Sequence, residues 1–480
     1  MCFGGRAAII IPDRLLEVKS MGLRALPEKL VCGVTAVFVF LIFAAAFRAL
    51  LDAAADIWLW LLCFCALAAG AFLLSRRLPE RLMLPLILLA ALAFRLPLTF
   101  TPDEAQVSDF ALLYDSAQRL AAGDVSVFSD SYFLYWGYQI PFVLYEAFVI
   151  SLGGGVTALR MLNLAWMCGA VGLCFLLARL VGGARAGFMA GVLYALYPGA
   201  AGMASVLTNQ HISLFFILLG VWLLLSRGPF SETGNTSSRL LWSALAGLSL
   251  AFGGLMRPEA ILAAASALVT AICLLLSGSP GFRRLAPAMA VFVAAYILTW
   301  LTASALVSAS GIAPGGISNN RPEWKFVLGL DTSSEGSYSE ENAYILDIED
   351  DGERRGAASA AISASLKSCD ELPAFFWHKL LKFWGAAEDT SFASGLPLSY
   401  EQLFFTERAA FLLAAALALS GCLFLLRRGA GAAGLMLMCL VSANFLCYLV
   451  IEVQPRYRLF IMPAVFALAA GYGHRKEKRV

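Results

Sequence analysis

The sequence predicts an all-α, polytopic membrane protein with about twelve transmembrane helices. Of the 480 residues, 60% are hydrophobic and only 14% are charged, and the mean hydropathy is +0.77. A soluble globular domain is far more polar than this. Apolar runs close to the roughly 20 residues that a helix needs to cross a bilayer recur along the chain. They are continuous, as in Leu84-Pro-Leu-Ile-Leu-Leu-Ala-Ala-Leu92, which favours helices over the alternating strands of a transmembrane barrel.

The predicted spans are separated by polar segments of very different length. In chain order the spans cover 31–50, 54–75, 81–100, 156–179, 185–203, 208–226, 240–256, 258–277, 286–310, 407–427, 430–451 and 457–473. The segment before the first span carries Arg6, Arg14, Lys19, Arg24 and Lys29. Because these charges interrupt any apolar core, no cleavable signal peptide is expected, and the first span is expected to remain as an anchor.

Basic residues occur in every second connection if each span crosses the membrane once. These connections and the tail carry Arg76, Arg77, Arg81, Arg179, Arg185, Arg227, Arg239, Arg283, Arg284, Arg427, Arg428, Arg475, Lys476, Lys478 and Arg479. Because Lys and Arg resist translocation, this side and both termini are predicted to be cytoplasmic. The long loops 101–155 and 311–406 then lie on the extracytoplasmic side, and the first of them is rich in acidic residues.

The two long outer loops are predicted to contain helices that lie on the membrane surface. Residues 132–152 are rich in Tyr, Trp and Phe with Pro141 in the middle, which suits short interfacial helices rather than a crossing. The second loop ends in the amphipathic stretch 375–384, where Lys379 and Lys382 would share a helix face. Nearly all eleven cysteines fall inside the predicted spans, so they are interpreted as packing residues rather than disulfides.

Three acidic residues after the third span are the candidate catalytic groups. Thr101-Pro-Asp-Glu104 matches a helix capping box, which explains Asp103 and Glu104 as well as a catalytic role does. Asp109 has no such capping role, and a carboxylate there is suited to act as a general base toward a hydroxyl or an amine. A solvated loop acid is the alternative interpretation of Asp109.

Several basic residues lie on the side where positive charge is normally scarce. They are Arg257 in Arg257-Pro-Glu259, Arg456 and Arg458 in Gln454-Pro-Arg-Tyr-Arg458, and Lys379 and Lys382. Any one arginine is more readily interpreted as a snorkelling side chain at a helix end. As a group they suit an anionic phosphate at the interface, which needs charge-assisted donors. His211 and His378 are expected to be interfacial histidines, and without metal-like His/Cys spacing no zinc site is predicted.

The order of these features resembles the GT-C glycosyltransferases, particularly the branch of the protein O-mannosyltransferases and aminoarabinose transferases. The shared order is a span, an acidic outer loop with interfacial helices, many spans, a large late outer loop and final spans, from about residue 81 to 473. In the family's register Asp109 takes the place of the catalytic Asp, because Ala117 and Gly123 follow at the expected distances. Phe110 stands where Glu is usual, so the pair Asp103-Glu104 is the second choice.

The resemblance implies inverting transfer of a sugar from a polyprenyl-phosphate donor to a cell-envelope acceptor at the extracytoplasmic face, with Asp109 as the base. Around the lipid phosphate it places Arg257, Lys379, Lys382, Arg456, Tyr457 and Arg458. Leu207-Thr-Asn-Gln-His211 resembles the family's second outer turn, which implies weaker roles in sugar or acceptor binding for Asn209, Gln210, His211 and Glu259. Since neutral amides bind sugar hydroxyls better than metals, dependence on a divalent cation is left open.

The resemblance also divides the chain into segments. They are a cytoplasmic N-terminal segment 1–30, two additional spans in 31–80, a GT-C-like core 81–310 with the catalytic loop 101–155, the outer loop 311–406, the final spans 407–473 and the tail 474–480. The expected location is a bacterial inner or plasma membrane, with membrane lipid, the donor and the acceptor as partners, and no nucleic acid. A transporter or a flippase for a lipid-linked intermediate fits the same layout, as does a non-catalytic envelope-assembly protein. Transporters place their polar groups near the bilayer midplane, whereas here they gather at one face.

Overall fold

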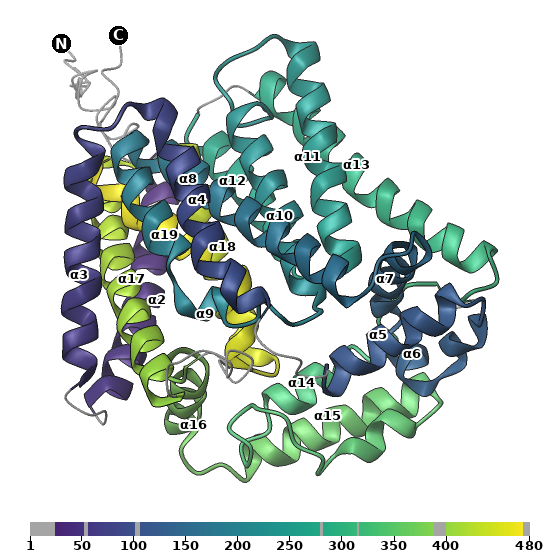
Figure 1. Cartoon of the computed structure of the whole chain (residues 1–480). Coiled ribbons are helices and arrows are strands. Elements are labelled where there is room, and N and C mark those ends of the chain that lie inside the picture. The colour runs from purple at the N-terminus through teal and green to yellow at the C-terminus, as the bar shows by residue number, and fades with distance from the viewer. Residues whose placement is uncertain are drawn as a thin grey trace, which may run out of the picture.

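The computed structural model describes residues 25–51, 56–100, 106–278, 282–313, 316–387 and 400–473. These residues form a helical bundle with a smaller polar lobe at one end (Figure 1). The only β pairing among them is an isolated bridge between Trp136 and Asn319. The predicted all-α class is therefore confirmed, as expected for a chain whose backbone polar groups must be satisfied within each segment in lipid.

Nine of the described helices are long and apolar enough to cross a membrane. They are α2 (Leu26–Leu51), α3 (Asp56–Ser75), α4 (Glu80–Thr99), α8 (Val156–Ala195), α10 (Asn209–Ser226), α11 (Thr236–Met256), α13 (Phe282–Ala309), α17 (Tyr400–Arg428) and α18 (Gly431–Val450). The shorter apolar helix α12 (Ala260–Leu276) corresponds to the predicted span 258–277. Each of the twelve predicted spans therefore has a helical counterpart, although three of them differ in form.

The predicted spans 156–179 and 185–203 form one helical element with a break. Helix α8 has 40 residues, and at 1.5 Å per residue it is too long for a single crossing of a hydrocarbon core about 30 Å thick. Gly183 interrupts it with φ 84°, a conformation that favours glycine. Beside it, a Cβ on Gly182 would lie 1.9 Å from the carbonyl oxygen of Ala470, so this glycine allows the C-terminal segment to pack against the break. After the break, α8 ends at Ala195 and the short helix α9 (Pro198–Ala201) follows.

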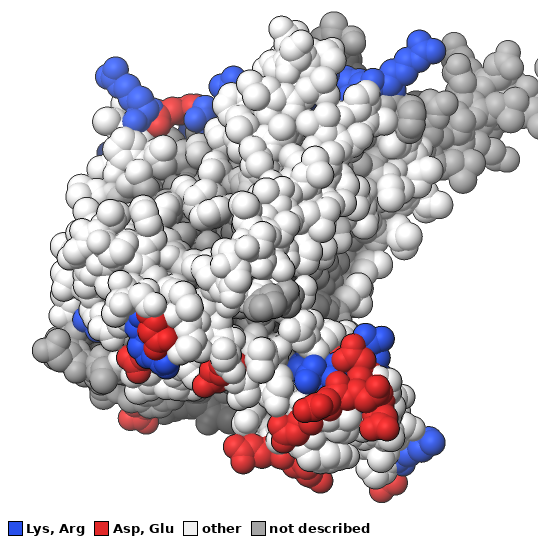
Figure 2. Space-filling model, turned by 90° about the vertical axis from the view of Figure 1, so that its right-hand side faces the viewer, with Lys and Arg blue, Asp and Glu red and all other residues white. Residues whose placement is uncertain are grey.

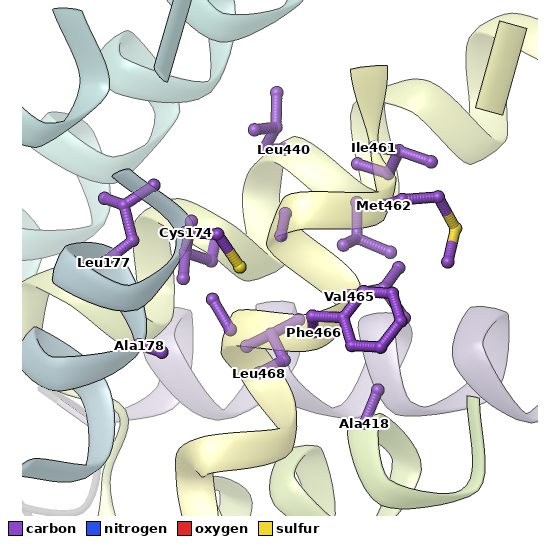
Figure 3. Close-up of a cluster of buried hydrophobic side chains, with 14 of the residues drawn as sticks. Cys174, Leu177, Ala178, Ala418, Leu440, Ile461, Met462, Val465, Phe466 and Leu468 are labelled. Atoms are coloured by element: carbon purple, nitrogen blue, oxygen red, sulfur yellow. The ribbon is translucent and has the colours of Figure 1, made fainter. Parts of the chain in front are cut away.

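The predicted last span, 457–473, is not one regular helix. It is formed by the 3₁₀ turn η6 (Pro455–Phe460), the short helix α19 (Met462–Leu468) and the 3₁₀ turn η7 (Ala469–Gly473). Pro455 and Pro463 lack an N–H group, and each occupies the first turn of a new element. This segment lies at the centre of the core, where α19 packs among buried side chains of α8, α17 and α18 (Figure 3). Gly421 of α17 makes the close approach possible, since a Cβ there would lie 1.9 Å from the carbonyl oxygen of Leu468.

The two long polar segments lie together and form the polar lobe, residues 106–151 and 316–380 (Figure 1). The first contributes α5 (Ser108–Ala121), η1 (Val125–Ser129), α6 (Ser131–Tyr135), η2 (Gly137–Gln139) and α7 (Ile140–Ser151). The second contributes α14 (Glu323–Gly329), η3 (Ala343–Asp347), α15 (Asp351–Lys367) and α16 (Leu372–Leu380), which continues into the wider turn η4 (Leu381–Gly385). With 12 residues, α7 is too short to span a bilayer, so the assignment of 132–152 as a non-crossing segment agrees with the structure.

Charge separates the two ends of the molecule. Acidic side chains gather over the polar lobe, whereas Lys and Arg predominate at the opposite end (Figure 2). At that end, Arg179 at the break in α8 pairs with Glu80 at the start of α4 across 3.1 Å. The short basic connections predicted from the sequence therefore share one end of the bundle, and the long polar loops share the other.

Candidate functional site

A cavity of about 460 Å³ opens between the polar lobe and the bundle. Its walls come from the first turn of α5, from η2, from the connection between α11 and α12, from α14, from the end of α18 and from η6. The charged and polar lining residues are Asp109, Tyr132, Tyr138, Gln139, Arg257, Glu259, Asn319, Lys325, Tyr338, Tyr448, Glu452, Gln454, Arg456 and Tyr457. Five of the residues predicted from the sequence, Asp109, Arg257, Glu259, Arg456 and Tyr457, thus meet in one cavity.

Arg257 and Glu259 stand at the connection between α11 and α12. Helix α11 ends where Arg257 takes an extended conformation, and Pro258 follows. The Nε of Arg257 lies 2.9 Å from Oε1 of Glu259, and its Nη1 donates to Oδ1 of Asn209 at 3.2 Å. Burial acts to lower the pKa of Arg257, but Glu259, Tyr457 and Tyr138 together outweigh it, so the pKa is raised above its ordinary value and the guanidinium stays charged.

Asn209 lies behind this pair and does not line the cavity. Its Nδ2 donates to Oε1 of Gln139 at 2.8 Å, and Gln139 does line the cavity. Because Asn209 bonds both Arg257 and Gln139, it connects the α11–α12 connection to the first polar segment. The predicted contribution of Asn209 to binding would therefore act through these two neighbours.

A second ion pair, between Lys325 and Glu452, was not predicted from the sequence. The Nζ of Lys325 bonds Oε2 of Glu452, and the backbone N–H of Glu452 donates to the carbonyl of Lys325 at 2.9 Å. Burial acts to lower the pKa of Lys325, and Tyr457 together with Glu452 raises it above its ordinary value. The available signal was an acidic residue directly after the apolar run 430–451, two positions before Gln454-Pro-Arg-Tyr-Arg458.

Three cations converge on the ring of Tyr457 in η6. The Arg257 guanidinium lies 5.3 Å from the ring centroid, that of Arg456 5.6 Å and the Lys325 ammonium 5.9 Å. Arg456 also lies over the ring of Phe110, at 5.4 Å. Such positions over an aromatic face are attractive and hold the cations close together. Tyr457 is therefore the centre of the positive side of the cavity.

The charges that line the cavity do not all form pairs. Arg257 pairs with Glu259 and Lys325 with Glu452, whereas among the residues that the structure describes neither Asp109 nor Arg456 has an ion-pair partner. Asp109 is exposed in the first turn of α5, and the Nε of Arg456 is buried without a hydrogen-bond partner in the described chain. The cavity therefore presents the carboxylate of Asp109, which can accept a proton, and the guanidinium of Arg456, which can bind an oxyanion.

Aromatic side chains complete the walls. Tyr132, Trp136 and Tyr138 come from the first polar segment, and Trp324 and Tyr338 come from the second. Burial raises the pKa of Tyr132 and that of Tyr138, so both phenols remain protonated and can donate hydrogen bonds. Flat apolar faces beside phenol and amide donors suit a ring with several hydroxyl groups.

Two residues predicted to bind phosphate are buried away from the cavity. Lys379 is 1% exposed, and its ammonium donates to the carbonyls of Gly329, Leu449 (3.1 Å) and Ile451 (2.9 Å). Arg458 is 0% exposed and donates from Nη1 to the carbonyls of Phe383 (3.0 Å) and Ala386 (2.7 Å). Both side chains donate hydrogen bonds to backbone at helix ends, so they satisfy carbonyls that have no partner within the helix.

The other predicted residues lie outside the cavity. Lys382 is half-exposed and lies 3.2 Å from Oε2 of Glu335. His211 is buried in α10, where Nε2 lies 3.0 Å from the carbonyl of Met203. Gln210 is buried next to it and does not line the cavity. Asp103 and Glu104, the second choice for the base, lie outside the described residues. In the described ranges no three His, Cys, Asp or Glu side chains form a group that could hold a metal.

An apolar groove of about 470 Å³ adjoins the cavity between α11, α12 and α13. The two share Tyr138, Pro258, Ile261 and Asn319 as lining residues. Beyond these, the groove is lined by Gly254, Tyr296, Ile297, Trp300, Leu301 and Ile317. Polar cavity and apolar groove therefore form one continuous site with a charged end and a hydrophobic end.

Comparison with known proteins gives matches among solved structures. No family model matches the chain, and no curated protein matches it significantly. The archaeal oligosaccharyltransferase AglB from Archaeoglobus fulgidus, solved in complex with an inhibitory peptide and a dolichol-phosphate, is similar with a TM-score of 0.49 and 15% identity. That match covers 83% of this chain and 50% of the other, so the chain spans about half the length of that protein.

Two further solved structures are similar at comparable identity. The apo form of the Archaeoglobus fulgidus oligosaccharyltransferase has a TM-score of 0.46 and 15% identity, over 81% of this chain and 50% of that chain. ArnT from Cupriavidus metallidurans, bound to undecaprenyl phosphate, has a TM-score of 0.37 and 14% identity, over 81% of this chain and 77% of that chain.

Proposed function

We propose that this protein is a membrane glycosyltransferase of GT-C type that transfers a sugar from a polyprenyl-phosphate donor to a cell-envelope acceptor. The observation that carries the proposal is a pair of charges, Asp109 and Arg456, that have no ion-pair partner in the described part of the chain and that line a cavity continuing into an apolar groove. A donor of this class has the same three parts, namely a sugar, a phosphate and an apolar chain. The dolichol-phosphate and undecaprenyl phosphate named with the solved neighbours are of the class proposed here.

Each part of the donor is assigned to one region of the site. Arg456 offers a planar fork of donors to the phosphate oxygens, and Arg257 and Lys325 add positive potential from across the Tyr457 ring. The isoprenoid chain occupies the groove beside Tyr296, Trp300 and Leu301. The sugar lies against the aromatic walls of the cavity, near Asp109 and the open side of the polar lobe.

The reaction is an inverting displacement at the anomeric carbon. Asp109 removes the proton from the acceptor hydroxyl or amine as the acceptor atom forms its bond to that carbon. The bond from the anomeric carbon to the phosphate oxygen breaks on the opposite side, and its electron pair stays on the phosphate. Arg456 stabilises the negative charge that develops on the phosphate. Because its guanidinium is already in position before the reaction, this interaction lowers the activation barrier for transfer. The site faces the extracytoplasmic side, where the donor's headgroup meets envelope acceptors.

Replacing Asp109 with Asn tests this assignment. The amide keeps the size of the side chain but cannot accept the proton, so we expect sugar transfer to fall by about 10²-fold or more. Expression and donor binding should be retained. Transfer is measured with purified protein, a lipid-linked sugar and an envelope extract as the source of acceptor. Asp115→Asn is the matched control, because Asp115 is an exposed acid of the same helix and does not line the cavity.

Mass spectrometry of gently purified wild-type protein tests the donor class independently. A co-purified polyprenyl phosphate supports the proposal, and full activity of the Asp109→Asn variant would remove Asp109 from its role. Transbilayer movement of a lipid-linked sugar in proteoliposomes without any transfer would instead indicate a flippase. Absence of both movement and donor consumption would favour an assembly protein.

A further inference from the structure

The turn η6, which presents Arg456 and Tyr457 to the cavity, is anchored from behind by Arg458. Arg458 is fully buried, and its Nη1 donates to the carbonyls of Phe383 at 3.0 Å and Ala386 at 2.7 Å. Its Nε donates to the carbonyl of Pro455, at the start of η6 itself, at 3.2 Å. Because η6 is a short 3₁₀ turn, Arg458 contributes much of what fixes its position.

A second buried arginine, from α17, reaches the same stretch of backbone. The Nη1 of Arg408 donates to the carbonyls of Trp384 and Gly385, each at 2.9 Å. Both guanidiniums therefore bind the C-terminal end of the α16–η4 segment, where the last carbonyls of a helix lack partners and carry partial negative charge. The two cations also lie over one ring, that of Phe411, at 4.6 Å for Arg408 and 5.0 Å for Arg458.

Glu407 makes this arrangement of two buried cations stable. It is 0% exposed, and Oε1 accepts from Nη2 of Arg408 at 2.6 Å and from the Tyr197 hydroxyl at 2.6 Å. The same oxygen lies 3.8 Å from Nη2 of Arg458. The Glu407 carboxylate offsets the repulsion between these two like charges, which is poorly screened in an apolar interior.

We infer that Glu407 is a positioning residue for the donor-binding site: through Arg458 it holds η6 in place, and with it Arg456 and Tyr457. Glu407 does not line the cavity, so its effect on the donor is exerted through Arg458 and η6 and not by direct contact. The consequence for donor binding rests on the proposed function. The anchoring of η6 does not, because it follows from contacts within the chain.

Glu407→Gln separates charge from shape, since the amide still reaches Arg408 and Tyr197. The first readout is amide hydrogen exchange of the peptide that contains η6, without ligand; it reports the bonds from Tyr457 N–H to Gln454 and from Ile461 N–H to Arg458. We expect exchange there to accelerate about tenfold, and the KM for a lipid-linked donor to rise about tenfold with a smaller change in kcat. Glu407→Asp keeps the negative charge, so its amide exchange at η6 and its KM should both lie closer to the wild-type values. Glu80→Gln is the matched control, because it breaks an exposed ion pair at the opposite end.

The double variant Glu407→Gln with Arg456→Gln tests whether Glu407 acts through Arg456. Since the phosphate contact of Arg456 is already lost, the loss of polyprenyl-phosphate binding in the double variant should be smaller than the sum of the losses in the two single variants. Additive losses, or unchanged exchange at η6 in Glu407→Gln, would overturn the inference. If wild-type protein binds no polyprenyl phosphate but exchange at η6 still accelerates, the proposed function fails and the anchoring stands. Should Glu407→Gln not fold, Tyr197→Phe removes one hydrogen bond from the carboxylate, and the same exchange readout decides.

Discussion

Single buried cations outside the cavity hold helix ends in this protein. Arg95 of α4 donates to the carbonyls of Tyr194, at 3.2 Å, and Ala195, which are the last two residues of α8. Lys379 does the same for the ends of α14 and α18. Helix-end carbonyls inside an apolar bundle have no water to bond, so an unmet group there would be costly. A buried lysine or arginine is one way to satisfy several of them at once.

Lys379 makes stability depend on pH in a defined direction. Burial lowers its pKa from 10.5 to about 7. Between pH 7 and pH 10.5, Lys379 is protonated in the unfolded chain but not in the folded protein, so the free energy of unfolding rises with pH. Below about pH 7, Lys379 is protonated in both states, and the cost of burying its charge does not change with pH. Relative to Lys379→Met, the free energy of unfolding of the wild type should therefore rise by up to about 1.4 kcal/mol per pH unit in this window.

The measurement is reversible unfolding of both proteins in mixed micelles at a series of pH values. Lys382→Met is the control, because Lys382 is half-exposed and pairs with Glu335 at the surface. The control should show no such slope. A difference between wild type and Lys379→Met that stays constant with pH would show that Lys379 keeps its proton throughout.

The two polar segments act as one element because their backbones meet at Trp136 and Asn319. The bridge between these residues is extended by the N–H of Asn320, which donates to the carbonyl of Tyr135 at 3.0 Å. Both Trp136 and Asn319 line the cavity, so the contact between the segments forms part of its wall. Gly137 makes the contact possible, because a Cβ there would lie 2.7 Å from the carbonyl oxygen of Ser318.

Gly137→Ala should separate the two segments. The added methyl group meets backbone that cannot move without breaking the bridge, and such overpacking costs about 1–3 kcal/mol. We expect faster amide exchange at Asn320 and reduced sugar transfer. Gly155→Ala is the matched control, since a Cβ on Gly155 meets nothing within 4 Å and lies in the neighbouring connection. Unchanged exchange at Asn320 in the Gly137→Ala variant would show that the bridge does not hold the segments together.

At the scale of the whole molecule, the distribution of charge predicts how the protein sits in the membrane. The acidic polar lobe and the basic short connections occupy opposite ends of the bundle (Figure 2), and basic connections resist translocation. The lobe and its cavity are therefore expected on the extracytoplasmic side. Cys369, partly exposed in the polar lobe between α15 and α16, is a natural reporter of this side.

Labelling of intact cells with a membrane-impermeant maleimide tests the orientation. In a variant that retains only Cys369, we expect labelling without permeabilisation. Arg76→Cys in a background without other cysteines is the control for the opposite end, because Arg76 is exposed in the connection between α3 and α4. It should react only after the membrane is opened. The reverse pattern would place the cavity on the cytoplasmic side and remove envelope acceptors from the proposal.

The positions of the spans followed from the sequence alone, because whether a stretch can cross a bilayer depends on its own hydropathy and length. The grouping of Asp109, Arg257 and Arg456 in one cavity was also anticipated, since all three lie at the same ends of their spans. Local pattern did not reveal the irregular form of the last span, where Pro463 and close glycine contacts replace a regular helix.

What only the tertiary structure decided is the partner of each charge. Lys325 and Glu452 are 127 residues apart in the chain, and no local pattern brings them together. In the sequence, Lys379 and Arg456 were grouped as cations on the extracytoplasmic side that suit an anionic phosphate. Lys379 meets the carbonyl ends of two distant helices, whereas Arg456 meets an open cavity. The hydropathy of a segment can be read from that segment alone. The partners of a charged side chain depend on which helix ends, distant in the sequence, pack beside it, and only the tertiary structure shows these.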